Sequence, residues 1–469
     1  MNITTWPRSV RQLLKLYLDR TFYARVFELA LPITFQQFVF AVLNLAGSLV
    51  VGQLGDVSVA AVGLCNQIYF LFNLLLFGIT SGASIFAAQF WGQRDVPNIR
   101  RVLGLTLGLS IASAGLFTLI ALVWPEGALG IYSRDPAVIA LGAHYLRVSG
   151  FSCLFMAVSY GYAAMLRSVG QVRAPMVASV LALVFNLVLS YGLVLGRLGL
   201  PRLEAVGAAY GLGLSRCLEC LILVVATYWN KTPVAATLRE MFSFDRRLTW
   251  AVLQRILPVT FNEVLWSLGV AVYNIIYARL GTDALAAINI VSAIDSLAFV
   301  PFLALGSACA ILVGHEIGAG NGPQAFRYAG LLMGLSTVSA MAEGLLLWAV
   351  AGQVLQFYKV SAVTTEYAQG IIAFLALGLW VRSANYILFV GILRAGGDTR
   401  FALIIDAGSI WLVGVTLAWL GAFVLHWPVP LVYLLTLGDE LAKWFIVMNR
   451  FFSHKWIHHV AQTAQPGQP

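Results

Sequence analysis

Long runs of apolar residues fill most of this chain, and short polar or glycine-rich segments separate them. About twelve runs reach the roughly 20 residues that a helix needs to cross a bilayer. Stretches such as Leu181–Phe185 lack the alternation of apolar and polar residues that a transmembrane strand would show. The pattern therefore predicts an all-α integral membrane protein, with helices over residues 27–52, 59–88, 100–124, 137–165, 172–196, 203–229, 250–279, 285–314, 325–351, 365–393, 400–425 and 429–450.

The chain contains two copies of one unit. Leu257–Asn321 repeats Leu31–Asp95 without a gap, and Leu393–Arg400 repeats Leu166–Arg173 between the fourth and fifth predicted helices of each copy. An even number of helices in each copy means that both copies insert in the same orientation. The sequence therefore predicts two six-helix lobes related by a parallel repeat, with an axis along the membrane normal.

The repeat and the one long polar segment between its copies define the predicted domains. We expect a cytoplasmic or interfacial N-terminal segment, a first lobe, an interlobe linker rich in charged residues, a second lobe and a cytoplasmic tail. These domains cover residues 1–26, 27–229, 230–249, 250–450 and 451–469, respectively.

Composition and charge agree with a membrane protein. Of 469 residues, 60% are hydrophobic and only 10% are charged, whereas about a quarter of the residues in a soluble protein are charged. The net charge of +9 does not indicate nucleic-acid binding, because about nineteen of the basic residues fall in segments on one side of the predicted membrane and about five on the other. This bias predicts a plasma (inner) membrane protein with both termini in the cytoplasm.

Several motifs recur at matching places in the two copies. They are Leu31-Pro32 and Leu257-Pro258, the Leu-Gly-x-x-x-x-Ala-Ala turns at 54–61 and 280–287, and the Leu-Arg-x-x-Gly-Asp-Thr-Arg loop at 393–400. With these motifs the whole chain resembles the MATE (multidrug and toxic compound extrusion) transporters of the flippase-like superfamily. The resemblance implies a V-shaped, two-lobed multidrug exporter that exchanges a small organic, cationic substrate for sodium or protons. In one departure, Gly47 stands where the family often has an acidic residue in the first helix.

Ionisable side chains inside membrane helices are costly and mark candidate functional sites. Four acids of the second lobe, Glu263, Asp295, Glu343 and Asp406, have no basic residue three or four positions away. A carboxyl in apolar surroundings binds protons more readily, and its oxygens also suit a hard cation such as sodium.

We therefore expect Glu263 and Asp295 to be the coupling acids and to form a possible sodium site, with Asp406 assisting and Arg382 as the internal counter-ion. Glu343 is expected nearer the outer surface. No cofactor or further metal is expected. Polar neighbours that would complete the site are Asn262, Asn274, Asn289 and Asn385.

An alternative interpretation makes these groups a buried ion network that only holds the lobe together. Two other charge pairs, Arg216 with Glu219 and Glu440 with Lys443, have the i,i+3 spacing at which opposite charges on one helix neutralise each other.

Two further features of the sequence concern helix geometry. Pro301 is expected to interrupt the eighth helix near Asp295, and Gly104 with Gly108 has a spacing typical of close helix packing.

Two other functions compete with the exporter. A lipid-linked precursor flippase of the same superfamily would need several cations in its cavity, whereas cations near the middle of the predicted spans are few, chiefly Arg147, Arg216 and Arg382. A membrane-embedded enzyme would need a clustered nucleophile and base, and no Gly-x-Ser-x-Gly or histidine-rich metal motif occurs in the sequence. We expect a monomeric transporter in a lipid bilayer, not an enzyme.

Overall fold

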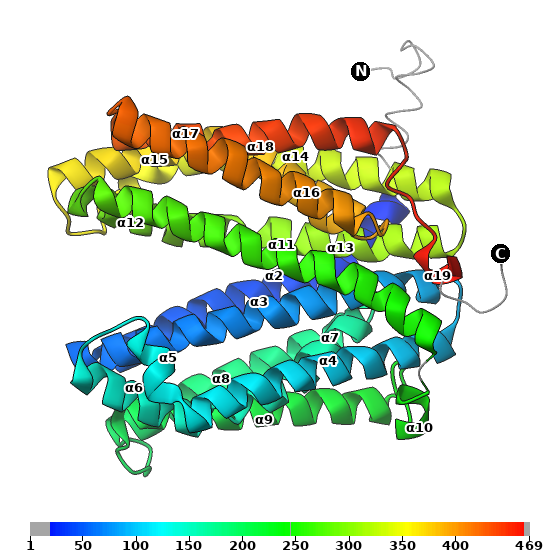
Figure 1. The fold of residues 1–469 in the computed structure, drawn as a ribbon, viewed down its shortest axis with the longest axis horizontal. Coiled ribbons are helices and arrows are strands. Elements are labelled where there is room, and N and C mark those ends of the chain that lie inside the picture. Colours follow the sequence, from blue (N-terminus) through cyan, green and yellow to red (C-terminus); the bar gives the residue numbers. More distant parts are fainter. Residues whose placement is uncertain (1–18, 244, 464–469) are drawn as a thin grey trace. The chain divides into compact units, whose positions relative to one another are not determined.

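The computed structural model describes residues 19–243 and 245–463, and the chain forms helices and no strand in these ranges (Figure 1). Residues 1–18 of the predicted N-terminal segment and residues 464–469 of the predicted tail lie outside the described residues. Each of the twelve expected ranges contains one helix or one run of consecutive helices. The expected all-α fold class is confirmed.

The chain divides into two compact units. The N-terminal unit comprises Phe35–Val264 and Val460–Pro469, and the C-terminal unit comprises Met1–Thr34 and Leu265–His459. Two long helices, α2 (Arg20–Gly52) and α11 (Arg246–Arg279), each contain a boundary between the units.

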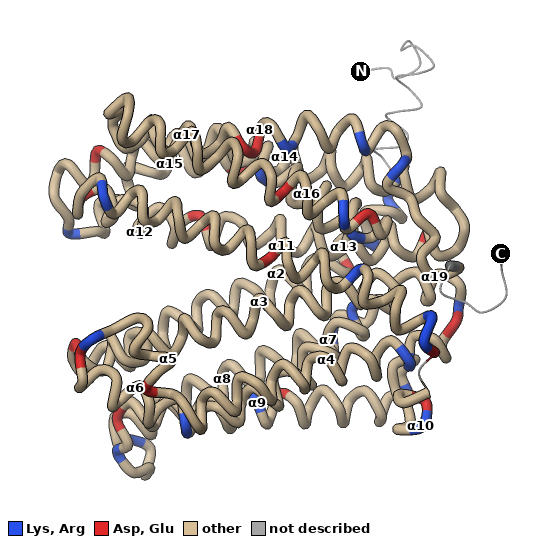
Figure 2. Tube along the Cα trace, viewed as in Figure 1, with Lys and Arg blue, Asp and Glu red and all other residues tan. Residues whose placement is uncertain are grey.

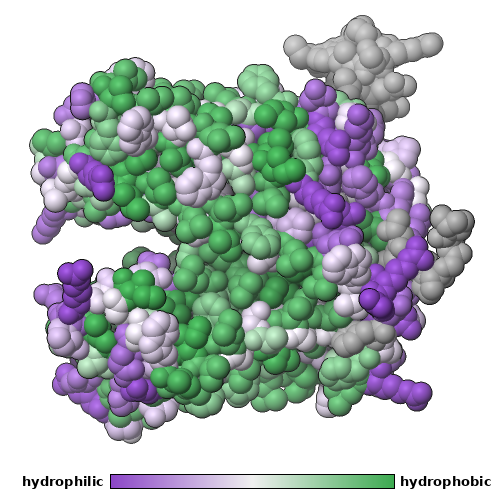
Figure 3. Space-filling model, viewed as in Figure 1, coloured by the Kyte–Doolittle hydropathy of each residue, from purple (hydrophilic) through white to green (hydrophobic). Residues whose placement is uncertain are grey.

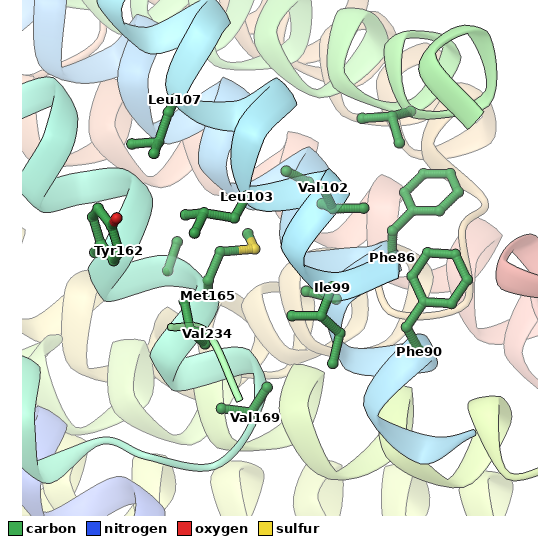
Figure 4. Close-up of a cluster of buried hydrophobic side chains, with 14 of the residues drawn as sticks. Phe86, Phe90, Ile99, Val102, Leu103, Leu107, Tyr162, Met165, Val169 and Val234 are labelled. Atoms are coloured by element: carbon green, nitrogen blue, oxygen red, sulfur yellow. The ribbon is translucent and has the colours of Figure 1, made fainter. Parts of the chain in front are cut away.

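Helices of the N-terminal unit pack around continuous apolar clusters. One cluster, shown in Figure 4, joins Phe86 and Phe90 of α3 to Leu103 of α4 and Met165 of α7. The other helices of this unit are either short or lie around α3, α4 and α7. Besides parts of α2 and α11, the unit contains α3 (Asp56–Gly92), α4 (Val96–Val123), α5 (Pro125–Gly130), α6 (Pro136–Ser149), α7 (Ser152–Ser168), α8 (Arg173–Leu195), α9 (Glu204–Trp229), α10 (Leu238–Met241) and α19 (Val460–Thr463).

The C-terminal unit has the same order of spans but more irregular helices. Its eighth span is divided at Phe299, as Pro301 predicted, and its tenth and eleventh spans contain π-helical segments. Besides parts of α2 and α11, the unit contains α12 (Thr282–Ala298), α13 (Val300–Gly318), α14 (Gly322–Leu355), α15 (Ala362–Tyr386), η2 (Ile387–Leu393), α16 (Thr399–Ser409), η3 (Ile410–Val415), α17 (Thr416–Trp419), η4 (Leu420–Val424) and α18 (Val429–Phe452).

Most helices are suited to a bilayer. Within the described residues, ten are long and apolar enough to cross a membrane, and the bent pair of α6 and α7 gives an eleventh span. The last helix, α18, has 24 residues, but Asp439, Glu440 and Lys443 make it more charged than the others. Charged residues are sparse along the helix middles in Figure 2, and Figure 3 shows apolar side chains over most of the helix surface, which fits contact with lipid.

Glycines in left-handed backbone conformations explain why the same motifs occur in both copies. Gly55 and Gly281 precede the second helix of each copy with φ of 92° and 124°. Gly170 and Gly397, in the matching loops, have φ of 83° and 77°. Residues with a Cβ rarely adopt these angles, so glycine at these four positions lets each copy make the same turns.

The segment between the copies packs closely on α4. Val234 of this segment is fully buried in the cluster of Figure 4. Thr237 caps α10 by accepting a hydrogen bond from the amide of Glu240, and the carboxylate of Glu240 pairs with Arg100 of α4 at 2.5 Å. The Cα of Gly104 faces the carbonyl of Met241, so α10 can approach α4 only because residue 104 has no side chain.

The residues after α18 fold back against the loop between η2 and α16. Trp456 is completely buried, and its ring stacks on Phe451. Asp398 of this loop pairs with Arg450 at 2.7 Å, and His458 lies 3.8 Å away. Burial raises the pKa of Asp398, but the interactions with His458 and Arg450 outweigh burial, so that its pKa is lowered from the ordinary 3.8.

Replacing Gly104 by alanine is expected to lower the stability of the protein by about 1 to 3 kcal/mol, because the added methyl group would overlap the backbone of Met241. Gly108→Ala is the matched control, since Gly108 lies on the same helix and faces open space. Melting temperatures of the purified proteins in detergent test this. Equal melting temperatures for the two variants would contradict the close approach of α10 to α4.

Replacing Asp398 by asparagine is expected to lower stability at neutral pH by about 1 to 3 kcal/mol, because charge-assisted hydrogen bonds are lost. A carboxyl with a lowered pKa stabilises the folded state above its ordinary value of 3.8 and loses this effect as the pH falls through the folded pKa. The melting temperatures of wild type and variant should therefore converge below pH 3.8. Glu366→Gln, at an exposed position, is the control, and a constant difference at all pH values would refute the ion-pair explanation.

Candidate functional site

An arginine and an aspartate pair inside the C-terminal unit. Arg382 of α15 donates from Nη1 and Nη2 to the two carboxylate oxygens of Asp295 on α12, at 2.7 and 3.0 Å. Both side chains are 23% exposed. The guanidinium also lies 5.2 Å from the centre of the Phe299 ring. This bidentate geometry orients both groups and balances one positive charge with one negative charge.

A lysine and three acids form a second group, which we call the lysine cluster: Asp406, Asp439, Glu440 and Lys443. The ammonium of Lys443 lies 3.1 Å from Asp406, 3.1 Å from Asp439 and 3.3 Å from Glu440. Its side chain is only 3% exposed. Asn385 of α15 donates to the carboxylate and the backbone carbonyl of Glu440, each at 2.7 Å.

Charge is not balanced in the lysine cluster. One ammonium faces three carboxyl groups, whereas Arg382 faces one. Arg382 also interacts electrostatically with Glu440, which links the pair to the cluster. Like charges this close repel one another strongly in a medium that solvates them poorly. A proton or a cation that bound among these carboxyl groups would reduce this repulsion.

Irregular helix geometry surrounds these groups. The break at Phe299 follows Asp295 within one helical turn, η2 follows Tyr386, and η3 begins soon after Asp406. Within the eleventh span, a side chain on Gly414 would overlap the hydroxyl of Tyr273 on α11. Helix breaks and π-helical turns frequently occur at functional sites, because they let a helix change its local geometry.

The structure brings together only part of the predicted site. Arg382, the predicted counter-ion, pairs with Asp295, and Asn385 lies against Glu440. Asn262 is buried and Glu263 is half-buried, and both lie on the part of α11 that belongs to the N-terminal unit. A sodium site shared by Glu263 and Asp295 therefore stays a prediction. The two further asparagines and the remaining acid do not join either charged group: Asn274 and Asn289 are exposed, and Glu343 is half-buried on α14.

Sequence reasoning missed Asp439 and underestimated Lys443. The predicted local contact of Glu440 with Lys443 is present. Lys443 also binds Asp439 on its own helix, at the i,i+4 spacing, and Asp406 on α16. Asp439 was detectable from that spacing. The contact with Asp406 was not, because it depends on how α16 and α18 face each other.

The N-terminal unit has a smaller counterpart of the lysine cluster. Arg216 of α9 pairs with Glu219 at 2.7 Å, as its spacing predicted, and Glu219 is 6% exposed. Glu219 also accepts a hydrogen bond from Ser179 of α8, and Ser179 accepts one from Gln36 of α2.

The register of the repeat relates the two groups. Counted from the matching Arg173 and Arg400, Ser179 corresponds to Asp406 and Arg216 corresponds to Lys443. Each copy therefore has a cation at the matching position of its last span; Lys443 binds Asp406 directly, whereas Arg216 is linked to Ser179 through Glu219.

Comparisons with known proteins agree with this architecture. Residues 32–192 and 258–420 match the MatE family model. The chain is 26% identical over 397 residues to the probable multidrug resistance protein YoeA of Bacillus subtilis, covering 82% of this chain and 84% of that protein. It is 25% identical to the probable multidrug resistance protein NorM of Agrobacterium fabrum, covering 85% and 86%.

Solved structures show the same fold. A MATE protein in complex with MaL6 superposes with a TM-score of 0.84 at 21% identity, over 92% of this chain and 96% of that one. The Vibrio cholerae MATE transporter VcmN gives 0.85 at 16% identity, over 92% and 97%. The family model covers both copies of the repeat, one match in each. This chain therefore belongs to the MatE family of membrane transporters, and it is a transporter and not an enzyme.

Proposed function

We propose that this protein is a secondary-active multidrug exporter that couples the efflux of small organic cations to inward movement of sodium or protons. The names of its relatives support the substrate class, since YoeA and NorM are described as probable multidrug resistance proteins. The observation that carries the coupling is the lysine cluster, where three carboxyl groups surround one buried ammonium.

The cluster can exchange ligands because its charge is incomplete. When a proton or cation occupies it, the excess negative charge is neutralised and the site is stable in the membrane. When that ion leaves, the excess charge attracts a cationic substrate or favours a rearrangement that admits water. Alternating access follows if the two states favour opposite openings of the transporter.

The roles of the predicted residues change accordingly. Asp406 becomes a central coupling acid, together with Asp439 and Glu440. Arg382 remains the counter-ion of Asp295, and this balanced pair, next to the break at Phe299, is suited to holding α12 and α15 in one arrangement. Glu263 stays a candidate coupling acid on α11.

Paired arginines count against a lipid-linked precursor flippase. Such a protein needs cations that are available to a phosphate group. Arg147 pairs with Glu126 at 2.5 Å, and Arg216 and Arg382 pair with Glu219 and Asp295. All three membrane arginines that the flippase would use are therefore neutralised by carboxylates.

We further propose that the protein works as a monomer in the plasma membrane with both termini in the cytoplasm. The asymmetry of basic residues between the two sides of the predicted membrane supports this orientation.

Purified protein in liposomes is expected to transport a cationic dye such as ethidium about ten-fold faster under an imposed proton or sodium gradient than without one. Protein-free liposomes are the control. Equal rates with and without each gradient would exclude an antiporter.

Asp406→Asn is expected to reduce gradient-driven dye transport about ten-fold or more, because it removes one excess carboxylate from the cluster. Lys443 keeps two carboxylate partners, so the variant should fold. Glu343→Gln, another membrane acid of this unit, is the matched control and should retain transport. Transport by Asp406→Asn at the wild-type rate would remove the lysine cluster from the coupling mechanism.

Glu263→Gln tests the remaining sequence prediction in the same assay. A loss of gradient-driven transport in folded, inserted protein is expected if this carboxyl binds the coupling ion. Undiminished transport would remove Glu263 from the proposed site and leave the lysine cluster as the coupling group.

A further inference from the structure

The ammonium of Lys443 is fully used by the cluster. It has three N–H donors, and three carboxylates lie within 3.3 Å of its nitrogen. Water reaches little of the side chain, which is 3% exposed. The centre of the acidic cluster is therefore already occupied by a cation that is covalently attached to the protein.

A sodium ion would have to compete with this ammonium. Sodium needs several oxygen ligands, and the best ones here are the same carboxylate oxygens that Lys443 binds. Binding them would place a second cation next to the ammonium, in a buried site where charges are weakly screened. The cluster therefore holds excess negative charge but offers no vacant centre for a metal cation.

A proton does not meet this obstacle. It bonds to one carboxyl oxygen and leaves the ammonium with the other two carboxylates as partners. The charged groups around Lys443 come from three helices: Asp439 and Glu440 on α18, Asp406 on α16 and Arg382 on α15, the last through Glu440. Together with the Asp295–Arg382 pair, the group contains four acids and two bases. Two protons would therefore neutralise its excess negative charge without any metal ion.

Two buried polar atoms next to the cluster would be available as cation ligands if the ammonium of Lys443 were removed. The hydroxyl of Tyr273 and the side-chain oxygen of Asn385 have no hydrogen-bond partner among the described residues. Tyr273 and Asp439 both lie against Gly414, and Asn385 binds Glu440. Neutral oxygens beside carboxylates are the ligands that a hard cation prefers.

The matching position of the other copy also carries a fixed cation. Arg216 corresponds to Lys443 in the register of the repeat, but it faces a single carboxylate, Glu219. The cation is thus common to both copies, and of these two positions in the described part of the chain, Lys443 is the one with more than one carboxylate partner.

We propose that Lys443 is a tethered cation that occupies the position of a coupling ion and thereby makes the transporter select protons over sodium. The inference rests on the proposed antiport function, because it names the ion that the cluster uses. It predicts that removing the ammonium converts the cluster into a sodium site formed by Asp406, Asp439, Glu440, Asn385 and Tyr273.

The first experiment uses the wild-type protein. In liposomes, ethidium transport should respond to a pH gradient at equal sodium, and a sodium gradient at equal pH should change it little. Melting temperatures in detergent should be the same in sodium chloride and in choline chloride. A sodium-driven rate, or stabilisation of the wild type by sodium, would overturn the proposal.

The second experiment compares Lys443→Met with Lys359→Met, an exposed lysine far from any span centre. Sodium, compared with choline, should raise the melting temperature of Lys443→Met and leave Lys359→Met unchanged. If Lys443→Met does not fold, the double variant Lys443→Met with Asp439→Asn, which removes a pair of opposite charges, takes its place. No sodium effect in a folded Lys443 variant would refute the tethered-cation role.

These outcomes separate the two proposals. If neither gradient drives transport, the antiporter proposal fails, while the melting experiments still decide whether Lys443 excludes sodium. If the pH gradient drives transport and sodium stabilises only the Lys443 variant, both proposals stand.

Discussion

A charge buried in a membrane helix needs a partner, and this requirement governs the polar interior of the C-terminal unit. Arg382 meets it with one aspartate, and the two groups satisfy each other. Lys443 meets it with three acids, which exceeds what neutralisation requires. One carboxylate would neutralise a buried lysine, and the second and third supply hydrogen-bond acceptors to its ammonium at the cost of burying further negative charge. In the proposed function, these additional carboxyl groups are the place where a coupling ion binds and is released.

The two copies share one scaffold, and the excess of acid lies in the second copy. Both copies have the same spans, the same glycine turns and a cation at the same position of the last span. Ser179 in one copy and Asp406 in the other show how one residue of the fifth span changes the charge around that cation. The C-terminal unit also has the broken eighth span and the π-helical segments, so its irregular backbone and its unbalanced charge occur together. The N-terminal unit pairs Arg216 with one acid and keeps a regular α8.

The sequence alone was sufficient for the fold and insufficient for the cluster. Span positions follow from hydrophobic length, and the repeat follows from motifs whose glycines need left-handed backbone, so both could be predicted. The contact of Glu440 with Lys443 was predictable because it lies within one helix. The contacts of Lys443 with Asp406 and of Arg382 with Asp295 depend on the rotation and packing of neighbouring helices, which hydrophobicity patterns do not specify in a bundle where most faces are apolar. Arg382 was predicted to be the counter-ion of the acids in this lobe, but the structure was needed to show that Asp295 is the acid it pairs with.

In the proposed mechanism, the lysine cluster holds protons that a cationic substrate displaces. The most direct test is to add ethidium to purified protein in weakly buffered detergent solution and to record the pH. We predict that dye binding releases protons from the wild type and fewer from Asp406→Asn. Dye binding to the wild type without any release of protons would contradict the account.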